Sequence, residues 1–155
     1  MPPTRRFLFA FAASIAAVGT AYAANPVMFR DAGCGCCLKW LEQVKASFGR
    51  KVTVVNSADM AAIKDKQGVP PALRSCHTVL VGGYVIEGHV PAKDIARLLR
   101  EKPKGVKGLA VGGMPIGSPG MEHGSHREAY QVITFGPGGQ RVYASYTASS
   151  GTHAH

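Results

Sequence analysis

Residues 33–37 read GCGCC, and this short stretch holds three of the four cysteines of the chain. The residues before it, NPVMFRD (25–31), form a short apolar run that is typical of a β-strand. After it, apolar side chains recur every three or four residues and predict an amphipathic helix over Cys37–Phe48, ended by a glycine. The sequence therefore predicts a strand, a cysteine-bearing turn and a helix in direct succession.

The rest of the chain predicts an α/β fold. Patterns of the same kind indicate strands at KVTVVNS (51–57), HTVLV (77–81) and YVIEG (84–88), helices at SADMAAIKDKQG (57–68) and VPAKDIARLLREKP (90–103), and a closing hairpin at EAYQVITFGPGGQRVYASY (128–146). Ser57 is expected to cap the first of these two helices. Glycine and proline predict that GVKGLAVGGMPIGSPGME (105–122) is mostly loop. We expect a central mixed sheet flanked by helices, with an additional C-terminal loop and β-hairpin.

The first 23 residues are typical of a secretory signal peptide. Arg5 and Arg6 give a positive start, an apolar run over 7–18 follows, and Ala21-Tyr22-Ala23 has the small-x-small pattern of a cleavage site. The apolar run is too short to span a membrane. An uncleaved N-terminal anchor stays open as an alternative, as does the choice between general and twin-arginine export. We therefore expect a periplasmic protein.

Removal of this leader leaves 132 residues. That is enough for one domain, expected over 24–146, with a disordered polar tail over 147–155. The leader carries two arginines and no acidic residue, so the net charge falls from +9 to +7. The lysines and arginines are spread thinly, which favours a solvated basic surface over nucleic-acid binding. Motifs of serine hydrolases, zinc hydrolases and phosphate-binding loops are absent.

The cysteine spacing argues against a disulfide scaffold. Two bridges are the usual expectation for four cysteines in an exported chain. Cys36 and Cys37 are adjacent, however, and adjacent cysteines pair only in a strained ring. A scaffold would also spread its cysteines along the chain, so the cluster favours metal binding or redox chemistry.

Cys34 and Cys37 have the C-x-x-C spacing at the start of a predicted helix. Unpaired N–H groups and the helix dipole favour a thiolate at such a position. A strand, a cysteine turn and a helix in this order are the thioredoxin arrangement. In thioredoxin-like folds a proline-threonine step opens the third strand and faces the cysteines, whereas this chain has Cys76 and His77 before the threonine. We expect Cys76 or His77 to lie against the cysteine turn.

Several motifs resemble the CopG-like family of periplasmic copper-resistance proteins. They are CGCCLKW (34–40), GVPPALRSCHTVLVGGYVIEGHVP (68–91), KGLAVGGMPIGSPGME (107–122) and the late Y-x-V-x-x-F (130–135). The resemblance runs from about Val27 to Tyr146. It implies a thioredoxin-like fold, a C-x-C-C motif that binds copper, and a part in copper tolerance.

The residue types fit Cu(I), which is soft and prefers thiolate and thioether ligands. Three thiols on one turn can bridge more than one ion, whereas one zinc ion prefers ligands spread around a tetrahedron. The predicted metal ligands are Cys34, Cys36, Cys37, Cys76, His77, Met114 and Met121. The two methionines are included because they lie in the glycine-rich loop rather than on an apolar face.

The remaining histidines and methionines are weaker candidates for metal ligands. Met28 and Met60 are expected in the core. His89 is expected to have a turn or capping role, with copper ligation as the lesser alternative. For His123 and His126, a Cu(II) site and no metal role are both open. The tail histidines, His153 and His155, are expected to be solvated.

We therefore expect an exported protein that sequesters Cu(I), transfers it or cycles its oxidation state. Its partners are expected to be copper ions and other periplasmic copper-handling proteins. A metal-binding protein is favoured over an enzyme. The alternatives are a thiol-disulfide oxidoreductase that uses Cys34 and Cys37, and a structural domain stapled by its cysteines.

Overall fold

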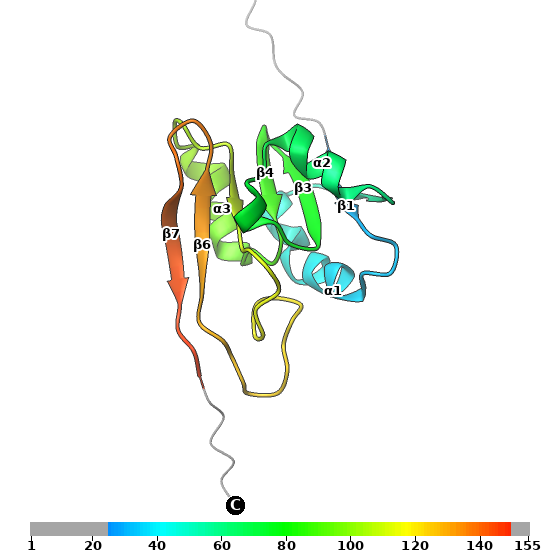
Figure 1. The fold of residues 1–155 in the computed structure, drawn as a ribbon, viewed down its shortest axis with the longest axis vertical. Helices are drawn as coiled ribbons and strands as arrows, with labels where there is room; N and C mark the ends of the chain where they lie inside the picture. Colours follow the sequence, from blue (N-terminus) through cyan, green and yellow to red (C-terminus); the bar gives the residue numbers. More distant parts are fainter. Residues whose placement is uncertain (1–24, 150–155) are drawn as a thin grey trace, which may run out of the picture.

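The computed structural model describes residues 25–149, which form a mixed sheet of seven strands with three α-helices (Figure 1). The strands are β1 Val27–Arg30, β2 Thr53–Asn56, β3 His77–Val81, β4 Tyr84–Glu87, β5 Gly108–Ala110, β6 Tyr130–Phe135 and β7 Arg141–Tyr146. The helices are α1 Gly35–Val44, α2 Met60–Gln67 and α3 Ala92–Glu101, with 3₁₀ turns η1 Lys45–Phe48 and η2 Pro71–Leu73. The expected leader and the tail from residue 150 onward lie outside the described residues.

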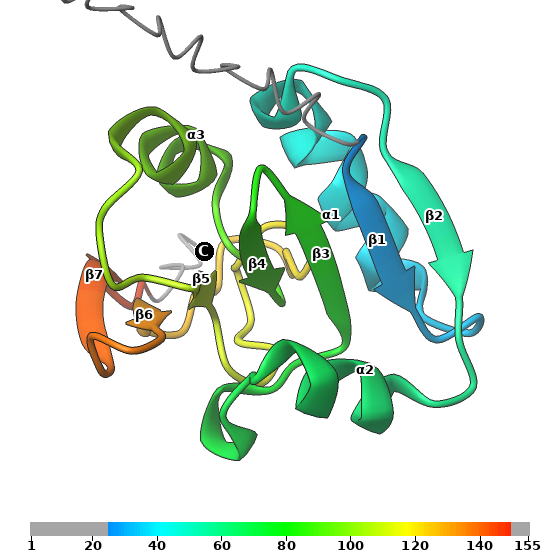
Figure 2. The ribbon, with the colours of Figure 1, turned by 90° about the horizontal axis from the view of Figure 1, so that it is seen from above.

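The strand order is β2-β1-β3-β4-β5-β6-β7. β1 pairs with β2, and β4 with β5, in parallel, while the other four pairings are antiparallel. Helices α1 and α3 lie on one face of the sheet and α2 on the other, as the view in Figure 2 shows. The α/β class, the mixed sheet flanked by helices, and the C-terminal loop and hairpin are thus as the sequence predicts.

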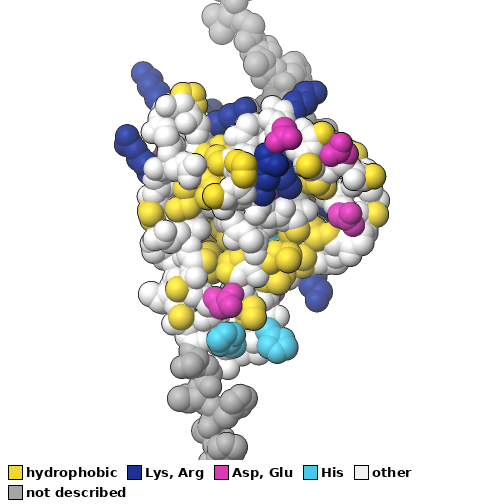
Figure 3. All heavy atoms as spheres, viewed as in Figure 1, with side chains coloured by type: hydrophobic (Ala, Val, Ile, Leu, Met, Phe, Trp, Pro, Cys, Tyr) yellow, Lys and Arg dark blue, Asp and Glu magenta, His cyan; other side chains and the backbone are white. Residues whose placement is uncertain are grey.

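Basic residues are scattered over the surface. On the face drawn in Figure 3, lysine and arginine side chains alternate with hydrophobic and uncharged ones and form no continuous stripe. Over residues 25–149, no helix combines the length and apolar character needed to cross a bilayer.

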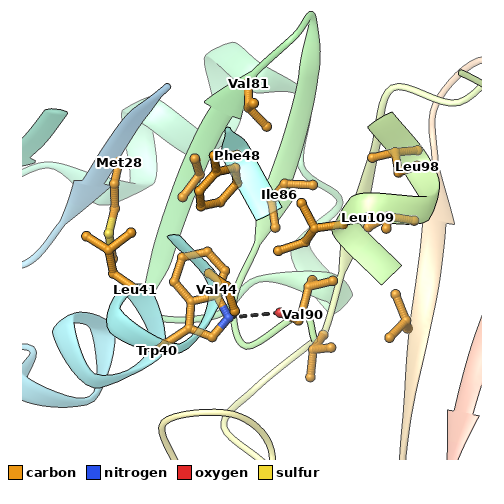
Figure 4. Close-up of a cluster of buried hydrophobic side chains, with 14 of the residues drawn as sticks. Met28, Trp40, Leu41, Val44, Phe48, Val81, Ile86, Val90, Leu98 and Leu109 are labelled. Carbon is orange, nitrogen blue, oxygen red and sulfur yellow. Dashed lines mark hydrogen bonds between the residues drawn. The ribbon is translucent and has the colours of Figure 1, made fainter. Parts of the chain in front are cut away.

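The larger hydrophobic core lies between the sheet and helices α1 and α3 (Figure 4). Trp40 and Val44 of α1 contribute fully buried side chains, as do Ile86 of β4 and Leu98 of α3. The indole N–H of Trp40 donates a hydrogen bond of 2.9 Å to the carbonyl of Val90, so the one polar atom of this side chain is satisfied inside the core. This core fixes α1, and with it the cysteine turn, against the sheet.

Three details differ from the sequence prediction. Helix α1 begins at Gly35, two residues early, because the glycine and the two following cysteines continue the turn into the helix. Asp59 rather than Ser57 caps α2, since its carboxylate accepts the Ala62 N–H at 2.9 Å. The segment expected as loop contains β5, where parallel pairing with β4 outweighs the local glycine content.

The two methionines expected in the core differ in burial. Met28 on β1 is fully buried in the larger core, as predicted. Met60 is only partly buried and does not belong to the core, because it opens helix α2 at the surface.

The register of β1 and β3 brings the two cysteine segments together. The strands are antiparallel, with Arg30 opposite His77. Residues after Arg30 therefore lie beside residues before His77. The chain after Arg30 leads into the cysteine turn, and the residue before His77 is Cys76.

A buried ion pair on the other face of the sheet supports the start of β3. Lys64 of α2 donates to the Glu87 carboxylate at 2.5 Å, and both side chains are almost fully buried. The same carboxylate accepts the Ser75 N–H at 2.7 Å and the Thr78 hydroxyl at 2.6 Å. Burial raises the pKa of Glu87, and the Lys64 ammonium opposes this effect. Glu87 thus holds the backbone immediately before Cys76.

We expect Glu87→Ala to lower the free energy of unfolding by about 3–5 kcal/mol, because it leaves a buried, unpaired lysine. Lys64→Met combined with Glu87→Leu should recover part of this loss. Lys45→Ala is the control, since it removes the solvent-exposed pair with Glu42 and should change stability by less than about 1 kcal/mol. Urea unfolding followed by circular dichroism measures all three. A cost below about 1 kcal/mol for Glu87→Ala would contradict the supporting role of the pair.

Candidate metal centre

Arg30 at the end of β1 shapes the cysteine turn. Its guanidinium is buried and donates to the carbonyls of Ala32 at 2.9 Å and Cys34 at 2.5 Å, and also to the Asn56 side chain at 3.1 Å. The Asp31 carboxylate accepts the Gly33 N–H at 2.7 Å. These bonds use most of the polar groups of the turn, so its backbone is held independently of any ligand.

The three clustered cysteines surround the start of α1. Cys34 is the N-cap residue, and Cys36 and Cys37 lie in the first helical turn. Cys34 and Cys37 form a disulfide, and Cys36 is free with its Sγ 3.4 Å from that of Cys34. The C-x-x-C pair is therefore oxidised in this state, beside one free thiol.

Cys76 completes a cluster of four sulfur atoms. Its Sγ lies 3.9 Å from the Sγ of Cys36, although forty residues separate the two in the chain. All four Sγ atoms lie within 4.8 Å of one another. The geometric expectation from the sequence, that Cys76 faces the cysteine turn, is confirmed.

Two fully buried histidines also contact Cys76. His77 Nδ1 lies 3.3 Å from the Cys76 Sγ, and His89 Nε2 lies 3.1 Å from it. The cysteine sulfur and one nitrogen of each ring lie within 4.8 Å of one another. Cys76 therefore belongs both to the sulfur cluster and to a group of one sulfur and two imidazoles.

The loop between β5 and β6 fixes the tautomer of His89. The Pro119 carbonyl lies 2.8 Å from His89 Nδ1 and can only accept, so Nδ1 carries the proton and donates. The lone pair of the neutral ring is then on Nε2, which points at Cys76. This is the arrangement typical of a metal-ligating histidine, with one nitrogen anchored and the other available.

Burial controls the protonation of these groups. It lowers the pKa of His77 well below its usual range, helped by the nearby His89 and Lys64, and it also lowers the pKa of His89. Both rings are therefore neutral at pH 7. Burial, with the neighbouring Cys36, raises the pKa of the Cys76 thiol to about 12, so this sulfur keeps its proton until a cation displaces it.

The residues present fit a soft metal ion. Four sulfur atoms lie close together, and neutral imidazole is a common metal ligand. Among residues 25–149, His77 Nε2 is a buried polar atom with no hydrogen-bond partner. Buried polar groups are normally paired, and this unpaired atom belongs to the ring whose other nitrogen, Nδ1, contacts the Cys76 sulfur.

The loop that carries the two predicted methionine ligands packs over the start of α1. Gly120 lies so close that a Cβ there would be 2.7 Å from the Trp40 nitrogen and 2.9 Å from the Cys36 carbonyl. The Glu122 carboxylate accepts the Gly120 N–H at 2.9 Å and the Gln43 amide at 2.8 Å, which ties the loop to the helix. This loop between β5 and β6, residues 111–129, therefore packs across the cysteine turn, and we call it the strap.

The two predicted methionine ligands, Met121 and Met114, differ in burial. Met121 follows Gly120 on the strap and is partly buried, whereas the Met114 side chain is 52% exposed. Met114 follows Gly113 in the chain, and the Gly113 carbonyl accepts the Ser75 hydroxyl. Gly113 and Met114 therefore lie near the segment that carries Cys76. As metal ligands, both methionines remain predictions.

The histidines outside the predicted ligand set fall into three groups. His89, expected mainly as a turn or capping residue, is fully buried and contacts Cys76; its spacing from His77 on the predicted β3–β4 hairpin was the signal for this position. His123 and His126 are exposed and outside the cluster. The tail histidines at 153 and 155 lie outside the described residues.

Comparison with known proteins gives a family and a structural match. A family model described as a protein of unknown function, DUF411, matches residues 73–121. A solved structure of the copper resistance protein CopG, form 1, matches with a TM-score of 0.73 and 44% identity over 81% of this chain and 98% of that one. Form 2 of that protein matches with a TM-score of 0.72 and 46% identity over 79% and 97%. A search of the curated proteins found no match.

We expect Gly120→Ala to displace the strap and to lower the free energy of unfolding. A strained φ by itself costs about 1–3 kcal/mol, and the loss should exceed this amount. The reason is overlap with backbone atoms of α1, which cannot move aside. Gly113→Ala is the matched control, because its φ of +68° is similar to the +81° of Gly120 but nothing lies within 4 Å of the added atom. Chemical unfolding gives the stabilities, and the ring chemical shifts of His89 report its bond to Pro119. Equal effects of both substitutions would show that the strap does not depend on close packing at Gly120.

Proposed function

The chain belongs to the family of the copper resistance protein CopG, and from this premise we propose that it holds Cu(I) in its cysteine cluster. The observation that carries the proposal is the set of four Sγ atoms within 4.8 Å of one another. Cu(I) is soft and prefers thiolates at low coordination number, and a thiolate can bridge two ions. Copper is here the cargo of the protein, and its binding serves copper resistance or homeostasis.

The two histidines extend the donor set. His77 Nδ1 and His89 Nε2 both contact the Cys76 sulfur, and both rings are neutral at pH 7. Cys76 is thus the shared member of the sulfur group and the imidazole group. Cys76 would therefore help to hold copper with either group, and Met121 and Met114 on the adjacent loop are further candidate ligands.

Loading requires reduction and proton loss. A dithiol reductant, which is itself oxidised to a disulfide, supplies the two electrons and two protons that convert the Cys34–Cys37 disulfide to two thiols. Each thiol that ligates copper then releases a proton. Since the Cys76 pKa is about 12, its proton is still bound at neutral pH. Affinity for Cu(I) therefore rises with pH, by up to about tenfold per unit for each proton displaced.

We further propose that the protein is exported to the periplasm and that its fold is thioredoxin-like. The signal-like sequence of residues 1–23 supports export. The succession of β1, cysteine turn and α1, with Cys76 facing the turn from the start of β3, supports the fold assignment. Its partners would then be copper ions and other copper-handling proteins of that compartment.

One observation favours a second candidate function. The Cys34–Cys37 disulfide lies at the N-terminus of α1, where thioredoxin-type oxidoreductases place their reactive pair. The free thiol of Cys36, 3.4 Å from Cys34, offers a competing partner for any mixed disulfide. This competition makes thiol-disulfide exchange the weaker candidate.

We expect Cys76→Ser to lower Cu(I) stoichiometry or to weaken affinity by more than about tenfold, because a hydroxyl is a poor ligand for a soft ion. His77→Ala should cause a smaller loss, because water or a loop methionine can replace an imidazole. Met28→Leu is the control, since it removes a buried sulfur outside the cluster. Anaerobic titration against a chromogenic Cu(I) chelator measures each variant, with ultraviolet thiolate-to-copper bands as a second readout. Unchanged binding in Cys76→Ser, or tighter binding of Zn(II) than of Cu(I), would refute the proposal.

The oxidoreductase candidate predicts its own result. We expect only weak insulin reduction by the reduced protein. The reason is that the Cys36 thiol can attack the mixed disulfide between Cys34 and the substrate, in competition with Cys37. Cys36→Ser should raise this activity and Cys34→Ser should abolish it. Turnover equal to that of a thioredoxin, and lost in Cys34→Ser, would instead make thiol-disulfide exchange the main function.

A further inference from the structure

We propose a second metal site, specific for Cu(II), formed by His123 and His126 at the tip of the loop between β5 and β6. The two residues flank the turn His123-Gly124-Ser125-His126 and form an antiparallel bridge. The His126 N–H donates to the His123 carbonyl at 3.3 Å. Gly124 has a φ of +56°, a conformation that glycine adopts readily in two-residue hairpin turns.

This pairing places both imidazoles on one side of the turn. Directly opposed residues in an antiparallel pair point to the same face, with Cβ atoms about 4.5–5.5 Å apart. One ring nitrogen from each residue can then reach a common ion at about 2 Å. Both side chains are exposed, and Figure 3 shows histidine side chains near one another, as separate patches, at the lower end of the described part of the molecule.

Neighbouring contacts hold the turn in place. Arg127 and Ser149 exchange two backbone hydrogen bonds, of 2.9 and 3.0 Å, and the Ser149 hydroxyl donates to the Ser125 carbonyl at 3.3 Å. The Arg127 side chain lies against Gly117, and strand alternation directs it to the opposite side from His126. The carboxylate of Glu128 accepts the Ile116 N–H at 2.8 Å. A cation at the turn therefore meets two imidazoles without a guanidinium beside them.

The donor set selects Cu(II). Imidazole suits copper, zinc and nickel, and Cu(II) binds most tightly of the divalent first-row ions at a given nitrogen site. Zn(II) sites usually have three or four protein ligands, whereas this turn supplies two and leaves the other positions to water. The cysteine cluster has the soft donors that suit Cu(I), so the two sites divide the two oxidation states between them. This inference does not depend on the Cu(I) proposal, because it uses neither the cysteines nor the buried histidines.

The tail is the main rival explanation for any Cu(II) bound here. Ser149 is fixed beside the turn, and His153 follows four residues later, within about 13 Å of extended chain. His153 and His155 therefore have to be tested separately from the turn.

The test uses the full chain carrying Cys36→Ser and Cys76→Ser, so that no free thiol reduces Cu(II). We expect one Cu(II) per chain, detected by electron paramagnetic resonance with nitrogen couplings, in competition with glycine as a weak chelator. His123→Ala with His126→Ala should weaken this binding at least tenfold. Ser125→Ala, in the same turn, and His153→Ala with His155→Ala should retain it. Circular dichroism checks that each variant is folded.

Three results would overturn the proposal. They are unchanged Cu(II) binding in the His123→Ala/His126→Ala variant, loss of binding in the tail variant alone, and displacement of copper by equimolar Zn(II). Cu(I) uptake by His123→Ala/His126→Ala with all four cysteines present is measured in parallel. It should equal that of the unmodified chain, so a failure of the Cu(I) proposal and a failure of this one give different results.

Discussion

The antiparallel pairing of β1 with β3 is the constraint on which the site depends. It sets Arg30 opposite His77 and so brings the cysteine turn beside Cys76. A register shift of one residue would turn His77 to the face covered by α2 and separate it from Trp40. Met28 and Val79, opposed in the same register and fully buried, make such a shift costly. Core packing thus determines which donor atoms meet.

The donors are fixed from three directions. Arg30 binds the carbonyls of the cysteine turn, Glu87 binds the Ser75 N–H from the opposite face of the sheet, and the strap carbonyl of Pro119 orients His89. None of these three groups is itself a candidate ligand. Together they hold the donor atoms in place, which reduces the reorganisation that metal binding requires.

The sequence predicted the parts of the fold that depend on local pattern. The β1–turn–α1 unit and the glycine hairpin between β3 and β4 follow from periodicity and turn residues, whereas the proximity of Cys76 to the cysteine turn was predicted from the similarity to the thioredoxin arrangement. β5 was missed because its three residues carry no pattern of their own and are strands only through pairing with neighbours. The hairpin spacing could have placed His89 near Cys76, but the carbonyl that orients its ring lies thirty residues later in the chain, in the strap, where no local pattern indicates it. The cap at Asp59 was misplaced by two residues, since Ser57 is equally suitable by residue type.

The position of Trp40 gives the protein a natural optical reporter. It is the only tryptophan of the chain, it is fully buried, and its ring centroid lies 4.3 Å from that of His77. Its indole N–H is already bonded to Val90, so solvent does not set its emission. Fluorescence from this single ring therefore responds to metal binding at the imidazole next to it. The rate of metal binding can be measured in unlabelled protein.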